Sequence, residues 1–247
     1  AREKLYKFTT GKPRTPLYDL GNLVAQHTIE ETHETGAKII RRIHDAGHVP
    51  LVFGGGHDLA FAEALGLLEA KQKKMGFLNI DAHLDLRPVT QGITSGSPWF
   101  LLREHPLFQK LKCQILEFGI QSHCNAHVLV EYAKRNKILI RWFHELKNPA
   151  QDFQKSLKQL EKNIGIQVSL DIDSVNWAEA PGASAPQTMG FQAKEAIAMS
   201  RAAGAHAKVC SFGIYELSPA LDSAGRTASL VAHCANAFLQ AYGERRK

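Results

Sequence analysis

Short apolar runs alternate with amphipathic stretches along nearly the whole chain. The runs Pro50-Leu51-Val52-Phe53 and Phe77-Leu78-Asn79-Ile80 are apolar on both faces, which is typical of strands covered on two sides. The pattern predicts strands at Pro16–Leu20, His48–Phe53, Gly76–Ile80, Gln114–Phe118, Ile138–Trp142, Gln167–Ile172 and Val209–Ile214.

Amphipathic segments between these runs predict helices. In Asp152–Ile164, apolar side chains recur at helical spacing from Phe153 onward, with Lys and Gln on the opposite side. The predicted helices are Thr28–Ala46, Asp152–Ile164, Ala193–Ala203 and Thr227–Tyr242. Strands that alternate with helices indicate an α/β fold with a mostly parallel sheet covered on both faces.

No internal repeat, low-complexity tract or flexible linker divides the 247 residues, so we expect one domain over residues 1–247. Two long connections, Arg87–Leu102 and Asn176–Gln192, are rich in Gly, Pro, Ser and Ala. Loops of that length in a compact domain are usually functional.

Composition narrows the choice of partners. The formal net charge is +6, but the basic residues are scattered; one of the two densest groups, Lys71-Gln72-Lys73-Lys74, has no interleaved aromatics. We therefore expect no nucleic-acid binding. No apolar run approaches the roughly 20 residues that span a bilayer, so we expect no membrane insertion. The four cysteines form no C-x-x-C pair, which favours reduced thiols in the cytoplasm.

Three polar clusters lie where apolar runs end. They are Gly54-Gly55-Gly56-His57-Asp58, Asp81-Ala82-His83-Leu84-Asp85 and Asp171-Ile172-Asp173. Ligands collect at the carboxyl ends of parallel strands, so these clusters should converge. Residues two apart on an extended chain point to the same side, which brings the acidic and imidazole side chains of each cluster together.

Four neighbouring carboxylates repel one another unless cations lie between them. A lone Asp-x-Asp is commonly a loop cap, but three titratable groups in Asp-x-His-x-Asp at the end of a buried strand are costly without a metal. Two divalent ions would remove this cost. Carboxylate oxygens and two imidazoles without thiolate favour Mn²⁺, while Zn, Co and Fe stay open.

In this order, the three motifs resemble those of the family of arginases, agmatinases and formimidoylglutamases. The resemblance extends from about Pro16 to the C-terminal helix. It implies a three-layer α/β/α sandwich with an eight-stranded parallel sheet, two manganese ions per subunit and assembly into a homo-oligomer. Seven strands are predicted here, and few residues precede the first metal-binding His; the first strand of that fold is either absent from this chain or lost in a shortened member.

The resemblance also implies roles for the residues of these motifs. One ion would be held by His57, Asp81, Asp85 and Asp171, and the other by His83, Asp81, Asp171 and Asp173. A hydroxide between the ions would attack the carbon of an amidine or guanidine. Asp85 or Asp173 would pass a proton to the leaving nitrogen.

Other positions favour one branch of the family. Asp85-Leu86-Arg87 resembles the Asp-x-Arg of formimidoylglutamases, and the loop Thr94–Phe100 lacks the His that arginases and agmatinases carry there. Arg87 would bind a substrate carboxylate, and Glu216 the cationic nitrogen end. Gln121 and Asn125 could add polar contacts. These positions predict an amidine C–N hydrolase that converts N-formimidoyl-L-glutamate and water into L-glutamate and formamide, a step in histidine degradation.

Three alternatives stay open. An arginase, agmatinase or guanidino-acid hydrolase would share the same ligands. A metal-binding scaffold of this fold without activity would also keep them. A zinc deacetylase of related topology would not need all six.

Overall fold

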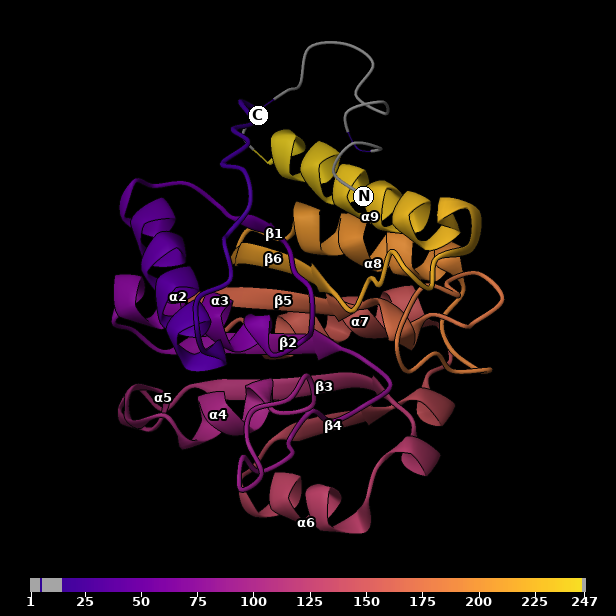
Figure 1. Ribbon diagram of the computed structural model, residues 1–247, viewed down its shortest axis with the longest axis horizontal. Coiled ribbons are helices and arrows are strands. Elements are labelled where there is room, and N and C mark those ends of the chain that lie inside the picture. The colour runs from indigo at the N-terminus through magenta and orange to yellow at the C-terminus, as the bar shows by residue number, and fades with distance from the viewer. Residues whose placement is uncertain (1–4, 6–14, 246–247) are drawn as a thin grey trace.

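The computed structural model describes residue 5 and residues 15–245. In this part the chain forms a six-stranded, all-parallel sheet with the order β1-β6-β5-β2-β3-β4. Figure 1 shows the strands side by side with their arrowheads pointing the same way. The strands are β1 (Leu51–Phe53), β2 (Met75–Ile80), β3 (Gln114–Ile120), β4 (Leu139–Trp142), β5 (Gly165–Asp171) and β6 (Val209–Tyr215).

Helices cover both faces of this sheet. One layer comprises α3 (Leu59–Lys71), α4 (Pro98–Glu104), α5 (Pro106–Lys110) and α6 (His127–Arg135), with α2 (Ile29–Asp45) packed outside α3. The other layer comprises α7 (Pro149–Gln159), α8 (Ala193–Ala205) and α9 (Arg226–Glu244). The fold is therefore the expected three-layer α/β/α sandwich.

Each strand sends alternate side chains into the two layers. On β2, Met75 and Phe77 belong to the cluster beneath α3, whereas Leu78 and Ile80 belong to the cluster with α7 and α8. This period of two is the ordinary consequence of an extended backbone. It explains why the central strands are mostly apolar on both faces.

The strand order creates a crevice beside β2. After β2 the chain passes to α4 in one helix layer, whereas after the neighbouring β5 it passes to α8 in the other. The segments that follow β2 and β5 therefore leave the sheet toward opposite faces. Such a divergence opens a crevice at the carboxyl edge of the sheet, between the two strands. The Asp81 and Asp171 clusters follow these two strands.

Several predicted boundaries are corrected. Pro16–Leu20 is not a strand: it pairs with no other strand of the described chain, and Tyr18 and Leu20 are 68% and 71% exposed. Without a neighbouring edge and a buried face, the apolar residues there cannot hold a strand. The first sheet strand is only Leu51–Phe53, and the described sheet has six strands rather than seven or eight.

The predicted helices are found with shifted ends. The helix expected at Asp152–Ile164 starts at Pro149, because the Asn148 side chain accepts a hydrogen bond from the Gln151 N–H and caps it, and it ends at Gln159. The loop predicted at Arg87–Leu102 contains the start of α4 at Pro98. Among the described helices, none combines the length and the apolar character that crossing a membrane requires.

Candidate metal centre

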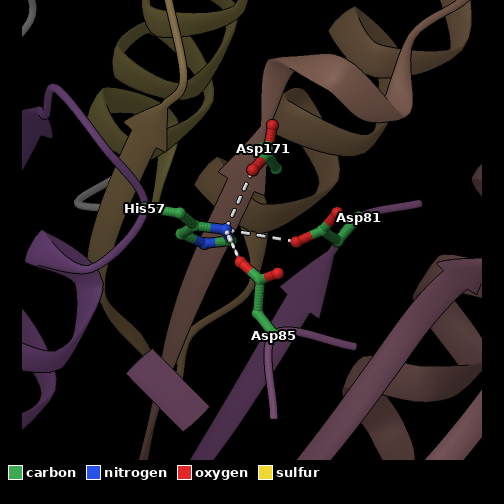
Figure 2. A group of neighbouring side chains, drawn as sticks. All are labelled: His57, Asp81, Asp85 and Asp171. Carbon is green, nitrogen blue, oxygen red and sulfur yellow. Dashed lines mark ion pairs between the residues drawn. The ribbon is translucent and has the colours of Figure 1, made fainter. Parts of the chain in front are cut away.

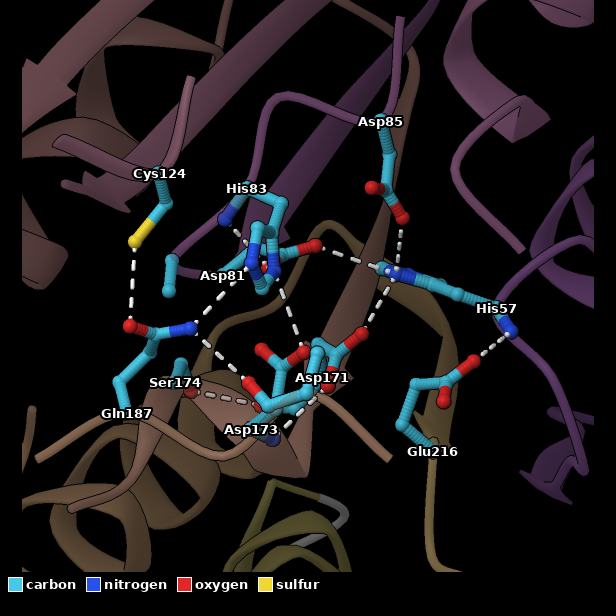
Figure 3. A network of polar contacts seen from close by, with 12 residues as sticks. His57, Asp81, His83, Asp85, Cys124, Asp171, Asp173, Ser174, Gln187 and Glu216 are labelled. Atoms are coloured by element: carbon cyan, nitrogen blue, oxygen red, sulfur yellow. Dashed lines mark hydrogen bonds and ion pairs between the residues drawn. The ribbon is translucent and has the colours of Figure 1, made fainter. Parts of the chain in front are cut away.

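The predicted metal-binding side chains meet at the carboxyl edge of the sheet. His57 lies in the turn between β1 and α3, and Asp81, His83 and Asp85 lie in the loop that follows β2. Asp171 is the last residue of β5, and Asp173 lies in the short 3-10 turn after it. Figure 3 shows all six side chains turned toward one another.

The first of two groups surrounds His57. The imidazole Nδ1 lies 3.1 Å from Asp81 Oδ2, 2.9 Å from Asp85 Oδ2 and 2.9 Å from Asp171 Oδ2 (Figure 2). None of these contacts has hydrogen-bond geometry, so Nδ1 is buried without a hydrogen-bond partner among the described residues. One ring nitrogen facing three carboxylate oxygens is the arrangement expected around a cation.

The second group surrounds His83, whose Nδ1 lies 3.1 Å from Asp173 Oδ2 and 3.5 Å from Asp81 Oδ1. Asp81 thus presents one carboxylate oxygen to each group. Within each group the ligand atoms lie within 4.8 Å of one another. Both groups contain only oxygen and imidazole donors, so they fit Mn²⁺ better than metals that prefer thiolate.

The pKa values describe how the cluster balances its charge. Burial disfavours a charged His57, but Asp171, Asp81 and Asp85 together outweigh it and hold the imidazole pKa well above its ordinary value. Burial also disfavours a charged His83, but Asp173 and Asp81 outweigh it and raise the pKa of His83 to about 12. Burial, followed by the charge of Asp81, raises the pKa of Asp173 to about 7. These groups hold protons in positions that divalent cations would take over.

Three side chains outside the predicted set hold His57. Its Nε2 lies 2.8 Å from Ser169 Oγ, so that Nδ1 faces the carboxylates. The Tyr215 ring stacks on the imidazole at 5.1 Å between centroids, and Trp99 meets it edge-on at 5.9 Å. Ser169 could have been found, because it lies two residues before Asp171 on the same strand. No sequence pattern indicates Tyr215.

The side-chain amide of Asn79 holds the Asp81 carboxylate. Asn79 Nδ2 donates to Asp81 Oδ2 at 3.1 Å and to Glu117 Oε2 at 2.9 Å, which links β2 to β3. Burial raises the pKa of Glu117 well above its ordinary value. Asn79 precedes Asp81 by two residues, so the period of two would have placed it on the same face.

A cavity of about 220 Å³ opens on the cluster. Its lining residues are His83, Asp85, Arg87, Ser95, Gly96, Asp171, Asp173, Ser184, Ala185 and Glu216. The Arg87 side chain lies against Gly96 in this lining, and no ion pair of Arg87 is found among the described residues. Ser184 was not predicted from the sequence.

Glu216 is anchored at both carboxylate oxygens. Oε1 accepts from the His57 N–H at 2.7 Å, and Oε2 accepts from Ser184 Oγ at 2.8 Å. Its backbone has φ +63°, a left-handed conformation that costs a non-glycine residue about 1–3 kcal/mol. The Glu216 N–H to Gly55 O bond, at 2.9 Å, holds that conformation. The carboxylate is therefore fixed at the cavity wall.

Gln121 and Asn125 lie behind the cavity wall rather than in it. Asn125 accepts from the Leu84 N–H and donates to the carbonyls of Ala82 and Gln121. Gln121 donates to the Met189 carbonyl at 2.8 Å. These bonds position the loops around the site. Their predicted substrate contacts stay a prediction.

A larger cavity of about 560 Å³ lies at the opposite edge of the sheet, near Lys74, Arg103, Lys112 and Lys137. Lys112 and Lys137 follow the carboxyl ends of α5 and α6, where the helix dipole favours cations. This cavity contains neither metal-binding group. The smaller cavity is therefore the candidate site for a metal-dependent reaction.

Comparison with known proteins agrees with this geometry. The model of the arginase family matches residues 2–240. The formimidoylglutamase of Geobacillus kaustophilus is 32% identical over 231 residues, which cover 90% of this chain and 70% of the relative. That of Legionella pneumophila is 33% identical over 219 residues, covering 87% and 68%. The crystal structure of Trypanosoma cruzi formiminoglutamase with Mn²⁺ superposes with a TM-score of 0.87 at 25% identity, covering 99% of this chain and 86% of that one. The chain belongs to the arginase family.

Proposed function

We propose that the protein is a formimidoylglutamase, a hydrolase that uses two Mn²⁺ ions to cleave the formimino C–N bond of N-formimidoyl-L-glutamate. The observation that carries the proposal is that Arg87 and Glu216 line the same cavity as the two His/Asp groups. A cationic side chain and an anionic one in the lining of a metal-binding cavity suit a substrate with carboxylates at one end and an amidinium at the other.

Six side chains would hold the metals in this proposal. His57, Asp81, Asp85 and Asp171 would hold one ion, and Asp81, His83 and Asp173 the other. Asp171 would also reach the second ion, because it lies beside Asp173. The Asp173 N–H donates to Asp171 Oδ1 at 2.8 Å. When bound, the ions would polarise the amidine and lower the pKa of water at the site.

The protein groups would orient the substrate and move its protons. Arg87 binds a substrate carboxylate, and the fixed Glu216 carboxylate accepts the formimino N–H. A water oxygen joins the formimino carbon, the bond from that carbon to the glutamate nitrogen breaks, and the nitrogen takes a proton. The products are glutamate and formamide. Asp85 or Asp173 delivers the proton.

The wider setting belongs to the same proposal. Residues 1–247 form one arginase-like domain, the subunits assemble into a homo-oligomer, and the protein acts in the cytoplasm on a small molecule. The four cysteines are free thiols, which agrees with a reducing compartment. Sedimentation analysis of the purified protein tests the assembly, since a monomer at all concentrations would contradict it.

The reaction is tested by offering the manganese-loaded protein four substrates: formimidoylglutamate, arginine, agmatine and guanidinobutyrate. We expect formamide and glutamate from the first and little turnover of the others. Urea from arginine, without formamide from formimidoylglutamate, would move the protein to the arginase branch. Two bound ions without turnover of any substrate would favour the metal-binding scaffold.

Arg87→Met tests the substrate end of the site. Hydrogen bonds to charged groups contribute about 1.5–3 kcal/mol, so we expect kcat/KM to fall roughly 10- to 150-fold, mainly through KM. Arg87→Lys should recover part of the loss. Arg103→Met, at the opposite edge of the sheet, serves as the control. An unchanged KM in Arg87→Met would remove Arg87 from the proposal.

A further inference from the structure

A buried acid lies outside the metal centre, on the face of α3 that meets β6. Glu63 is 1% exposed, and the hydroxyls of Ser211 and Tyr215 donate to its two carboxylate oxygens. Burial raises the pKa of Glu63 to about 7. A buried acid destabilises the fold unless its oxygens have hydrogen-bond partners. Both oxygens of Glu63 have one, so the Glu63, Ser211 and Tyr215 side chains hold one another in place.

The Tyr215 ring lies between this acid and His57. Gly54 and Gly213 leave the space that the ring occupies, because a Cβ atom on either one would overlap it. The ring then stacks on the His57 imidazole at 5.1 Å between centroids and 24° between planes. Its position is thus set by its hydroxyl bond to Glu63 and by two backbone segments.

We propose that Glu63 is a positioning residue for the ion at the His57 group, acting through the Tyr215 hydroxyl to fix the plane of the imidazole. The inference rests on the proposed metal centre. A metal–imidazole bond needs the Nδ1 lone pair aimed at the ion, and Ser169 fixes only one atom of the ring. The stacked Tyr215 ring restricts the remaining rotation about the line from Cβ to Nε2.

The effect should fall on one ion only. Among the described residues, no hydrogen bond, ion pair or ring contact joins His83 to Tyr215 or Glu63; Gln187 lies near its second nitrogen, with 3.4 Å between Nε2 atoms. Partners that orient metal ligands typically change metal affinity about 10- to 100-fold when they are removed. We expect a loss of that size at the His57 ion and none at the His83 ion.

The test measures Mn²⁺ binding, with free Mn²⁺ followed by electron paramagnetic resonance. Glu63→Leu removes both acceptors, and Tyr215→Phe keeps the ring and removes only the hydroxyl. Each should weaken one of two sites, and the double variant should be no weaker than Glu63→Leu alone, because both act through one contact. Glu63→Gln keeps an oxygen acceptor and an amide donor for the two hydroxyls and should restore binding. Glu69→Leu, on the same helix, is the matched control.

Variants that keep a single ion identify the site concerned. In a His83→Ala background, Glu63→Leu should weaken the remaining ion 10- to 100-fold; in a His57→Ala background it should have no effect. Equal effects in both backgrounds, or additive losses in the double variant, would overturn the proposal. Should Glu63→Leu fail to fold, Tyr215→Phe decides alone. A wild-type protein that binds fewer than two ions would refute the metal centre itself. Two ions in the wild type, with wild-type affinity in the Glu63 and Tyr215 variants, would refute only the positioning role of Glu63.

Discussion

The two halves of the metal centre share Asp81 but are built differently. The His57 side chain is completely buried, and Ser169 on β5 and Tyr215 on β6 contact its ring. The His83 side chain is 13% exposed and lines the cavity, and Gln187 from the loop between β5 and α8 lies beside it. In the first half, called the sheet-built half below, the imidazole is held by side chains of β5 and β6; in the second, called the loop-built half, the imidazole lies beside a loop residue.

This difference separates two tasks. Ser169 and Tyr215 lie on paired strands and are fixed by backbone hydrogen bonds, so they can hold the His57 ring without adjustment. His83 lines the cavity, where the substrate must enter and the product leave, whereas His57 does not. The His83 imidazole therefore combines metal binding with access. Variants in the two halves should therefore differ in the size of the metal loss and in whether added imidazole can restore it.

The largest effect is expected at the carboxylate that both halves use. Asp81→Ala removes an oxygen from each group, so both Mn²⁺ ions should be lost and activity should fall more than a thousandfold. Metal analysis of the dialysed protein measures the first and formamide release the second. Asp45→Ala, at the exposed end of α2, is the control. Retention of either ion in Asp81→Ala would show that the halves do not depend on a shared ligand.

Loss of one imidazole should remove one ion, and the halves should differ in rescue. In His83→Ala the vacated space opens on the cavity, so added imidazole should restore the second ion and part of the activity. In His57→Ala the space lies among Ser169, Tyr215 and Trp99, where the wild-type side chain is 0% exposed, so imidazole should restore nothing. Manganese stoichiometry with and without imidazole measures this. Equal rescue of both variants would contradict the difference in enclosure.

The metal ligands could be predicted from the sequence because they depend on local order. His57, Asp81 and Asp171 each lie at or just after the carboxyl end of an apolar strand, and parallel strands bring these ends to one edge. Spacing of two residues then adds His83, Asp85 and Asp173. None of these steps requires knowing which strands are neighbours.

The supporting residues could not be predicted in the same way. Glu63 and Tyr215 are 152 positions apart, and they meet only because α3 packs on β6. Pro16–Leu20 shows the opposite failure: its local pattern suited a strand, but no sheet edge in the described chain pairs with it. Long-range packing decided both cases, and a local pattern carries no information on it.

A smaller effect concerns the stability of the sheet-built half. The pKa of Glu63 is raised from 4.5 to about 7, so the folded protein keeps a proton that the unfolded chain releases between those values. Glu63 then contributes stability that is fully present below pH 4.5 and is lost as pH rises through about 7, in total about 3 kcal/mol. Urea unfolding of the metal-free protein at pH 5 and pH 8 measures it. Glu63→Gln should lack this part of the pH dependence; an equal dependence in both proteins would show that Glu63 is not the titrating group.

The smallest effect should come from the loop-built half. With Nδ1 of His83 on the metal, Nε2 carries the hydrogen, and the Gln187 amide can turn its oxygen to accept it. Gln187→Leu removes that acceptor, and we expect the affinity of the His83 ion to fall about tenfold, the low end for such partners, because the ring lines the cavity and can bond to water there instead. The His57 ion should bind unchanged, as both should in the control Gln159→Leu on the exposed face of α7. A loss of 100-fold or more in a Mn²⁺ titration would mean that the loop holds its imidazole as firmly as β5 and β6 hold His57.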